Sequence, residues 1–390
     1  MTKYSEKTLG NILKHDSKIT SYKIALLRAI NDVALSYPDM VRYGDDIAIP
    51  LRYLAEYWIS YYWPFVRQEN PIWQGNRRSL GNGGLANDMA FRDELTALRN
   101  AWDKIWQGSE PSDGFFLINE MHVQRKRKEY NLEFMSKYKR AISEIAESIK
   151  KPIQHAGPGS TNWHIFDKPK PLKEIRKRVN AVPGTREDDR CLIVPRKLYG
   201  IFVEMSLWIE ALCIHEWSLF VEGVEQHNGE PKHRGEIYKL LTARPDNRRP
   251  LTWERNKIEL LLMEGTTFTC PWTGKNIARN TKFDIDHILP VSVYPINEMW
   301  NLVPSDPRFN TNTKRNRIPD RDKLEKAKDP LSSTYAIYQS ADSLSGPLHS
   351  DIINRFYQFR EDSLIEPRDI SNAVVRYINT VADSRNLERF

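Results

Sequence analysis

The chain has 390 residues, a net charge of +7 at pH 7 and a pI near 9.1, which fits a polyanionic partner, since Lys and Arg displace counterions from phosphates. A hydrophobic share of 40% can fill real cores, which argues against a disordered chain, and the length predicts more than one domain. The charged share of 28%, together with the lack of an apolar run of spanning length, predicts a soluble protein with no membrane partner.

The cysteines and the N-terminal residues predict a cytoplasmic location. The three cysteines, Cys191, Cys213 and Cys270, are odd in number and far apart in the sequence, so a disulfide framework is not expected. The first residues also lack the apolar stretch that a secretory signal requires.

Residues 20–66 are predicted to be helical and rich in aromatic side chains. From Tyr22 to Ile30, apolar residues recur every three or four positions, which indicates a helix with a buried face, and Ser21 suits its N-cap. Leu51 to Phe65 predicts a second helix, ended by Pro64. Its aromatic residues could stack bases, but their helical spacing and the few cations between them favour core packing. They are Tyr57, Trp58, Tyr61, Tyr62 and Trp63.

Further helices are predicted along the chain. Helical patterns cover residues 87–106 and 129–150, and Arg196 to Val221 is expected to form one long buried helix. Residues 223–250 are polar and contain prolines, which marks a domain boundary. A helix over residues 253–264 then leads into the part of the chain with the richest chemistry.

The stretch from Phe268 to Pro319 brings together the residue types needed to cut a phosphodiester. Thr273-Gly274-Lys275 predicts a hairpin turn between two short strands, the second being Lys282–Asp286. Asn297 to Val303 is predicted to be a loop, and Asp306-Pro307 to open a final helix or turn. The predicted order is therefore strand, strand, loop and helix.

A carboxylate and a histidine stand side by side at the end of the second strand. Mg²⁺ or Mn²⁺ prefers oxygen ligands, and Asp286 supplies a carboxylate, while an asparagine of the following helix could supply a carbonyl. His287 has an ordinary pKa close to neutral pH, which suits it to take a proton from an attacking water. Neighbouring strand residues face opposite ways, so both can serve one site only if the strand ends or bulges there, as Pro290 makes plausible.

The pieces CPWTGK, DIDHILP and NLVPSD, followed by an asparagine, a lysine and a proline, resemble the HNH, or ββα-metal, endonucleases. They particularly resemble the HNH domain of RNA-guided CRISPR nucleases, over residues 265–322. The resemblance implies that Asp286 is a metal ligand, His287 the general base and Asn301 the loop asparagine that holds the histidine strand in place. Asp284, two positions before Asp286 on the same face, would support the metal from outside its ligand shell.

The second metal ligand stays open between two asparagines. Asn310 has the family spacing from the loop asparagine, but Lys314 then falls one residue later than usual, so Asn312 is an alternative. Many family members also hold a structural zinc with two Cys-x-x-Cys pairs. Cys270 has no such partner, so no structural zinc is expected and packing must hold the small domain together.

Cations are clustered in three places. Arg308, Lys314, Arg315 and Arg317 lie close to the candidate metal asparagines in the sequence and are expected to bind phosphates, although Arg315 and Arg317 could instead be partly structural. Two earlier basic groups, at residues 124–128 and 168–178, could follow a DNA backbone or form a solvated surface.

The sequence thus predicts a mainly α protein, with a large helical N-terminal region, a small α+β HNH nuclease domain and a helical C-terminal tail. The expected boundaries are 1–245, 246–325 and 326–390. The N-terminal region would recognise a target, a partner or a trigger, but it matches no familiar DNA-binding motif.

The predicted function is Mg²⁺-dependent cleavage of double-stranded DNA, and family habit suggests a prokaryotic defence or restriction role. Three alternatives remain. The chain could be a non-specific nuclease that is triggered by a protein activator or by homo-oligomer formation. It could be an RNase, because the site chemistry does not read the sugar. It could also be a catalytically dead nucleic-acid-binding protein.

Overall fold

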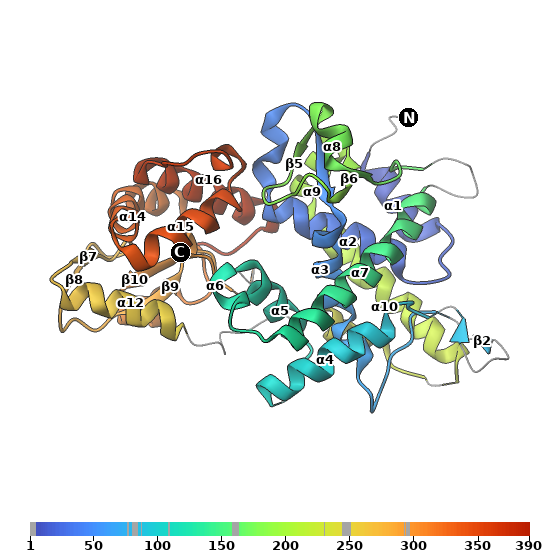
Figure 1. Ribbon diagram of the computed structural model, residues 1–390. Helices are drawn as coiled ribbons and strands as arrows, with labels where there is room; N and C mark the ends of the chain where they lie inside the picture. Colours follow the sequence, from blue (N-terminus) through green and yellow to red (C-terminus); the bar gives the residue numbers. More distant parts are fainter. Residues whose placement is uncertain are drawn as a thin grey trace. The chain divides into compact units, whose positions relative to one another are not determined.

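The protein, described here by a computed structural model, is mainly helical with small sheets (Figure 1), which confirms the predicted fold class. The structure describes residues 5–75, 78–79, 85–86, 88–107, 110–157, 164–229, 231–243, 251–291, 293 and 297–390. Two compact units form: unit 1 comprises residues 1–118 and 128–243, and unit 2 comprises 119–127 and 244–390. The predicted boundary after residue 245 falls outside the described residues.

Three helices form the centre of unit 1: α2 (Tyr22–Ser36), α3 (Leu51–Tyr62) and α7 (Leu132–His155). Helix α2 is buried along almost its whole length, which fits its apolar sequence. The predicted aromatic set lies here, with Trp58, Tyr61, Tyr62 and Trp63 buried. Core packing, rather than base stacking, is therefore the role of these four side chains. The remaining helices of unit 1 are α1 (Glu6–His15), α4 (Arg92–Trp106), α5 (Asp113–His122, which crosses the boundary), α8 (Leu172–Ile175), α9 (Arg196–Glu204), α10 (Ser206–His227) and α11 (Arg234–Leu241).

Unit 1 also holds a four-stranded sheet that the sequence did not predict. Its order is β4 (Lys170–Pro171), β6 (Arg190–Val194), β1 (Asp46–Pro50) and β5 (Val179–Ala181), with β1 antiparallel to β6 and parallel to β5. The basic group at residues 168–178 includes the edge strand β4 of this sheet. Its cations include Lys173 and Arg176, which form exposed ion pairs with Asp188 and Glu187, so these two belong to a solvated surface.

The single helix predicted for Arg196–Val221 is wrong, because the chain breaks at Met205. Helices α9 and α10 are bent by 83° relative to each other, and Met205 has φ −103° and ψ 17° between them. The break lets α9 pack on α2 and on the 3₁₀ helix η1 (Pro38–Tyr43), while α10 packs on α2 and α11. No single helix among the described residues is long and apolar enough to cross a membrane, although α9 and α10 as a bent pair pass by length and composition.

The second part of unit 2 contains α12 (Thr252–Met263) and, among its described residues, four short strands instead of the two predicted. The hairpin joins β7 (Phe268–Thr269) to β8 (Asn276–Ile277), and Gly274 provides the positive φ of +69° in its turn. The strand predicted to follow this turn is instead β9 (Asp284–His287), which pairs with β10 (Leu302–Ser305). Apolar Leu302 and Val303 are buried, which explains why the predicted loop contains a strand.

A helical tail completes unit 2. It follows α13 (Pro307–Phe309) and a π-helical turn (Asn310–Lys314), and consists of α14 (Arg321–Ser340), α15 (Asp342–Ile353) and α16 (Pro367–Arg385), which lie together in Figure 1. The last residues return to the HNH-like stretch: Ile318 N–H donates to Glu388 O at 3.0 Å, and Phe390 N–H donates to Ile318 O at 3.0 Å. The predicted tail, 326–390, thus belongs to the same compact unit as that stretch.

Two helical glycines provide a matched test of the unit 1 packing. A Cβ on Gly114 of α5 would lie 2.7 Å from Ser60 Cα and 2.9 Å from Trp63 Cβ, whereas a Cβ on Gly223 of α10 would meet nothing within 4 Å. We expect Gly114→Ala to lower the free energy of unfolding by about 1–3 kcal/mol, because overpacking outweighs helix propensity. Gly223→Ala should raise it by about 0.5–1 kcal/mol. Urea unfolding of both variants checks this, and equal effects would contradict the packing described.

Candidate functional site

The residues of the HNH-like stretch are arranged around the antiparallel pair β9–β10. In its register, His287 lies opposite Leu302 and Asp286 opposite Val303. Asn301, which is fully buried, closes the end of the pair. Its Oδ1 accepts the N–H of Leu289 at 2.8 Å, and its Nδ2 donates to the carbonyl of Leu289 at 3.0 Å. Asn301 therefore fixes the backbone that follows His287, and its catalytic importance stays a prediction.

Asp286 is a buried carboxylate with a donor on each oxygen. The indole Nε1 of Trp272 donates to Oδ2 at 2.7 Å, and the ammonium of Lys314 donates to Oδ1 at 2.9 Å. The same ammonium donates to the carbonyl of His287 at 2.7 Å. The side chains of Lys314 and Asp286 are only 1% and 4% exposed, so this is a buried ion pair. Together these contacts fix the carboxylate in one orientation.

A π-helical turn explains the late position of the lysine. Residues Asn310–Lys314 form this turn, and the N–H of Arg315 donates to the carbonyl of Asn310 at 2.8 Å, five residues back. A π turn accommodates one residue more than an α turn. Lys314 can therefore reach Asp286 although the sequence is one residue longer than usual, while Asn310 keeps its place facing β9.

The same turn separates the two candidate asparagines. Asn310 is half-buried, and its Nδ2 donates to Asp284 Oδ2 at 3.5 Å. Asn312 is exposed. Since Asp284 and Asp286 are two apart on one strand, their carboxylates share a face, and Asn310 lies against that face. The geometry therefore favours Asn310 over Asn312 as a ligand beside Asp286.

His287 is buried and held through one ring nitrogen. Its Nε2 lies 2.6 Å from Oδ1 of Asn297, and because an amide oxygen can only accept, Nε2 carries the proton. Nδ1 is then the basic nitrogen of the neutral ring. Burial lowers the pKa of His287 below its ordinary value of 6.5, against the opposing effects of the Asn297 hydrogen bond and the Asp286 charge. His287 is thus neutral near pH 7, the form that can take up a proton.

Strand β9 ends at His287, which meets the condition for Asp286 and His287 to serve one site. The two side chains have different partners. Asp286 contacts Trp272 and Lys314, whereas His287 contacts Asn297. A substrate phosphate would therefore have to lie across the end of β9 to meet both.

The donor set fits a hard divalent cation. Asp286 and Asn310 offer carboxylate and amide oxygens, the ligands that Mg²⁺ prefers, and the ammonium on Asp286 shows that this place already accepts positive charge. Among the described residues, no group of three or more His, Cys, Asp and Glu side chains could hold a metal. A metal ion here would therefore be bound by the carboxylate of Asp286 and the amide oxygen of Asn310, together with oxygens of the substrate.

The four cations near the asparagines have different environments. Arg308 and Arg315 are exposed, as expected for phosphate contacts. Arg317 is half-buried, pairs with Glu388 at 3.6 Å and donates to a backbone carbonyl, so it has a structural contact. Lys314 differs most from the expectation, because it is buried on Asp286.

Arg125, in the first basic group at residues 124–128, is likewise not a surface cation. Its guanidinium lies 2.6 Å from Glu254 of α12 and 3.4 Å from Asp351 of α15, within unit 2. Lys126 pairs with Glu120 at 3.3 Å. These two residues are therefore ion-paired inside the unit, which neither of the two alternatives for this basic group had included.

Two important contacts were missed by sequence reasoning. Trp272 was not assigned to the site, and Asn297 was only the start of a predicted loop. Trp272 lies in the CPWTGK piece, so its proximity to the motif was a usable signal. Asn297 had no such signal, because it reaches His287 by a fold that the spacing does not reveal.

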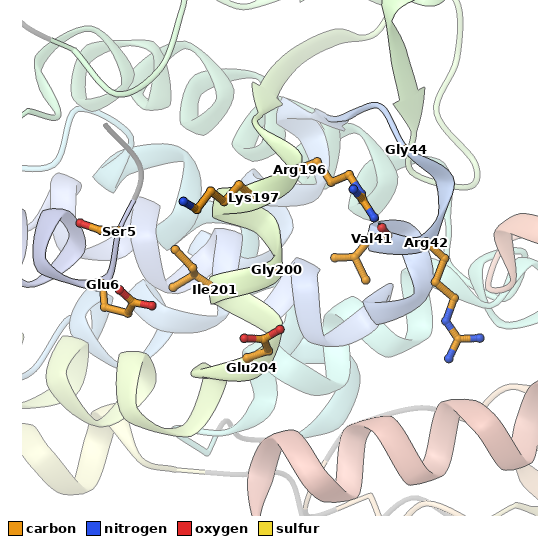
Figure 2. Close-up of a pocket in the computed structure, with 10 residues that line it drawn as sticks. All are labelled: Ser5, Glu6, Val41, Arg42, Gly44, Arg196, Lys197, Gly200, Ile201 and Glu204. Carbon is orange, nitrogen blue, oxygen red and sulfur yellow. The ribbon is translucent and has the colours of Figure 1, made fainter. Parts of the chain in front are cut away.

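Unit 1 contains a separate hollow of about 840 Å³, shown in Figure 2. Its charged lining residues are Glu6, Arg42, Arg196, Lys197 and Glu204, so both signs are present. Arg196 is anchored there, because its Nε donates to Val41 O at 2.6 Å. None of these residues belongs to the HNH-like stretch, and the hollow plays no part in the site described above.

Comparison with known families agrees with this division of the chain. Residues 270–320, which hold the β9–β10 pair and the π turn, match a family model described as HNH endonuclease, so the predicted HNH domain is confirmed. The narrower resemblance to RNA-guided nucleases stays a prediction. Residues 2–241 match a model described as a domain of unknown function, DUF8808.

Because the second match covers more than half of the sequence, the chain belongs to the DUF8808 family, and it carries an HNH endonuclease domain. No curated protein and no solved structure matches it. The nuclease class therefore rests on residues 270–320 and the geometry around β9.

The depressed pKa of His287 gives a direct prediction. In the metal-free protein, we expect the His287 ring to titrate below pH 6.5, because burial penalises the imidazolium. The same shift makes the free energy of unfolding depend on pH. Because the unfolded chain binds the proton more readily, the stability contributed by His287 is complete above pH 6.5 and is lost as the pH falls towards the native pKa. NMR of ¹⁵N-histidine-labelled protein, assigned by comparison with His287→Gln, measures it. A titration at or above pH 6.5 would contradict the described burial.

The indole of Trp272 gives a second prediction. Trp272→Phe keeps an aromatic ring, although a smaller one, and removes the donor to Asp286 Oδ2. We expect affinity for Mn²⁺, measured by calorimetry, to fall about 10–100-fold, as when other partners of metal ligands are removed. Trp208→Phe is the matched control, because Trp208 is 67% exposed on α10. Equal affinities of the two variants would show that the indole does not orient the carboxylate.

Proposed function

We propose that this protein is a metal-dependent endonuclease that hydrolyses phosphodiester bonds in double-stranded DNA. The observation that carries the proposal is the pair Asp286–His287 at the end of β9, within the residues that match the HNH endonuclease model. The carboxylate is fixed by two donors, and the imidazole is neutral with its proton on Nε2. These are the states that a metal ligand and a general base require.

In the proposed reaction, Nδ1 of His287 accepts a proton from the attacking water. The oxygen of that water bonds to phosphorus, and one P–O ester bond breaks. The leaving oxygen takes up a proton from solvent, which gives a phosphomonoester and an alcohol, and His287 then releases its proton to solvent. Bound at Asp286 and Asn310, Mg²⁺ or Mn²⁺ would offset negative charge on the phosphate and the leaving oxygen. Asn297 keeps the imidazole in the tautomer whose basic nitrogen is Nδ1.

Exposed cations provide the surface that would hold the backbone. Arg308 and Arg315 flank the turn that carries Asn310, and both are exposed. Their contacts would go to phosphates, which positions a nucleic acid without reading its sequence. The net charge of +7 adds a general attraction that weakens with salt. The DUF8808 region would then supply recognition or control, in a defence or restriction role in a prokaryotic cytoplasm.

The first test is a time course of supercoiled plasmid with the full-length protein and Mg²⁺. We expect the parent to nick or linearise the plasmid, and His287→Ala to lose about 100-fold or more of the rate, because positioned general bases contribute 10²–10⁴-fold. His215→Ala is the matched control, since His215 is exposed on α10 of unit 1. A His287→Ala variant as active as this control would remove His287 from the reaction.

The products and the competitors separate the rival functions. Discrete fragments from long DNA indicate sequence recognition, and complete degradation indicates a non-specific nuclease. Preferential inhibition by duplex RNA indicates an RNase. A folded parent that binds DNA but does not cut it in Mg²⁺ or Mn²⁺ favours a missing activator or a binding role.

The buried ion pair limits which variants can be used here. Removing the carboxylate of Asp286 leaves the Lys314 ammonium buried without its partner, which typically costs 3–5 kcal/mol of stability. Loss of cleavage in Asp286→Ala is therefore informative only beside a measurement of folding. His287 is neutral, so its removal leaves no orphaned charge.

A further inference from the structure

Unit 2 contains a nine-residue segment from the first half of the chain that contacts Asn297, the hydrogen-bond partner of His287. Residues Asn119–Arg127 belong to unit 2, although the residues before and after them belong to unit 1. They lie within the DUF8808 match and outside the HNH match. The segment comprises the end of α5 and the short helix α6 (Gln124–Arg127). Its contacts converge on Asn297, the residue that holds the His287 ring.

The backbone of Asn297 is held at both of its polar groups. Its N–H donates to Oδ1 of Asn119 at 3.1 Å, and its carbonyl accepts from the Arg125 guanidinium at 3.1 Å. Its side-chain Oδ1 is the acceptor for His287 Nε2 at 2.6 Å. Asn297, Asn119 and His287 are 3%, 3% and 6% exposed, so water does not replace these bonds readily.

Arg125 is itself fixed from several sides. Its guanidinium bonds Glu254 at 2.6 Å, approaches Asp351 at 3.4 Å and lies 4.9 Å from the ring centre of Trp253. Asp351 also accepts the N–H of Met299 at 2.8 Å, two residues beyond Asn297. The segment that carries Asn297 is thereby tied to α6, α12 and α15, which gives the contact to His287 a rigid base.

Stability alone does not account for Asn119. Its Nδ2 is buried and has no hydrogen-bond partner among the described residues. A buried donor left unsatisfied costs about 1–3 kcal/mol, which offsets what the bond from the Asn297 N–H to Asn119 Oδ1 contributes. The polar contribution of Asn119 within the described structure is the bond that fixes Asn297.

We propose that Asn119 and Arg125 are positioning residues, which set the orientation and tautomer of the His287 base through Asn297. The DUF8808 region thus supplies part of the nuclease site, and residues 270–320 alone are incomplete. The proposal rests on the function proposed above as far as catalysis is concerned. The tautomer of His287, however, can be measured without any cleavage.

Asn119 is the better residue to change. Removing Arg125 would leave Glu254 and Asp351 buried without their cation, and such a loss often unfolds the protein. Asn119→Leu removes only the acceptor for the Asn297 N–H at similar volume, and Asn119→Asp keeps that acceptor. Asn354→Leu is the matched control, because Asn354 is exposed in the same unit.

The experiment combines ¹⁵N NMR of histidine-labelled, metal-free, full-length protein at pH 8 with plasmid kinetics in Mg²⁺. We expect the parent and Asn354→Leu to show His287 protonated on Nε2, and Asn119→Leu to shift both ring nitrogens towards a mixture of tautomers. We also expect kcat to fall about 10-fold or more, a part of what a general base contributes. KM for DNA should stay unchanged, since the phosphate contacts are elsewhere. Asn119→Asp should restore most of kcat, which a merely structural loss would not allow.

Either measurement can overturn the proposal. It fails if the parent carries the proton on Nδ1, or if folded Asn119→Leu keeps the ring shifts and kcat of the parent. If Asn119→Leu does not fold, Asn297→Leu against Asn297→Asp is the second pair, read in the same way. If the parent cuts no DNA while Asn119→Leu still alters the tautomer, the positioning proposal stands and the proposed nuclease function fails.

Discussion

A buried ion pair between Lys314 and Asp286 joins the two halves of the HNH domain. It connects the π turn to β9, and the same ammonium bonds the carbonyl of His287. Because both groups have left water, the pair is tolerated only with further hydrogen bonds, and Trp272 supplies one of them. The position of Asn310 against Asp284 follows from the same turn. Charge and hydrogen bonds thus hold the site end of the small domain, beside a core that includes Trp300, Leu302 and Val303.

The residues of the motif were readable in the sequence, but their contacts were not. The order and spacing of Asp286, His287, Asn301 and Asn310 predicted the class of domain through their resemblance to the HNH endonucleases. The extra residue before Lys314 left two asparagines open, since a linear count cannot show whether a helix takes up an insertion as a π turn. The structure places Asn310 towards the strand and Asn312 towards solvent.

Outside the motif, the sequence predicted those elements whose structure depends on neighbouring residues in the chain. Helices with clear apolar periodicity were predicted, and the aromatic residues around Trp58 were correctly expected in the core. The bend at Met205 and the sheet around β1 were missed, because both depend on tertiary partners that no local periodicity contains. Arg125 shows most clearly what a local sequence pattern cannot predict. Within a run of cations it resembled a DNA contact, and only the acids of α12 and α15 reveal its structural place.

The segment 119–127 also affects when a nuclease can exist during synthesis. The bond between Asn119 and Asn297 spans 178 residues, which at about 5–20 residues per second takes a ribosome roughly 10–35 s to add. Residues 388–390 then bond to residues 318–320. A nascent chain therefore carries Asn119 long before Asn297, and the bonds to residues 318–320 form only after residues 388–390 have been made. A chain that stops before Asn297 would lack the acceptor of the His287 ring.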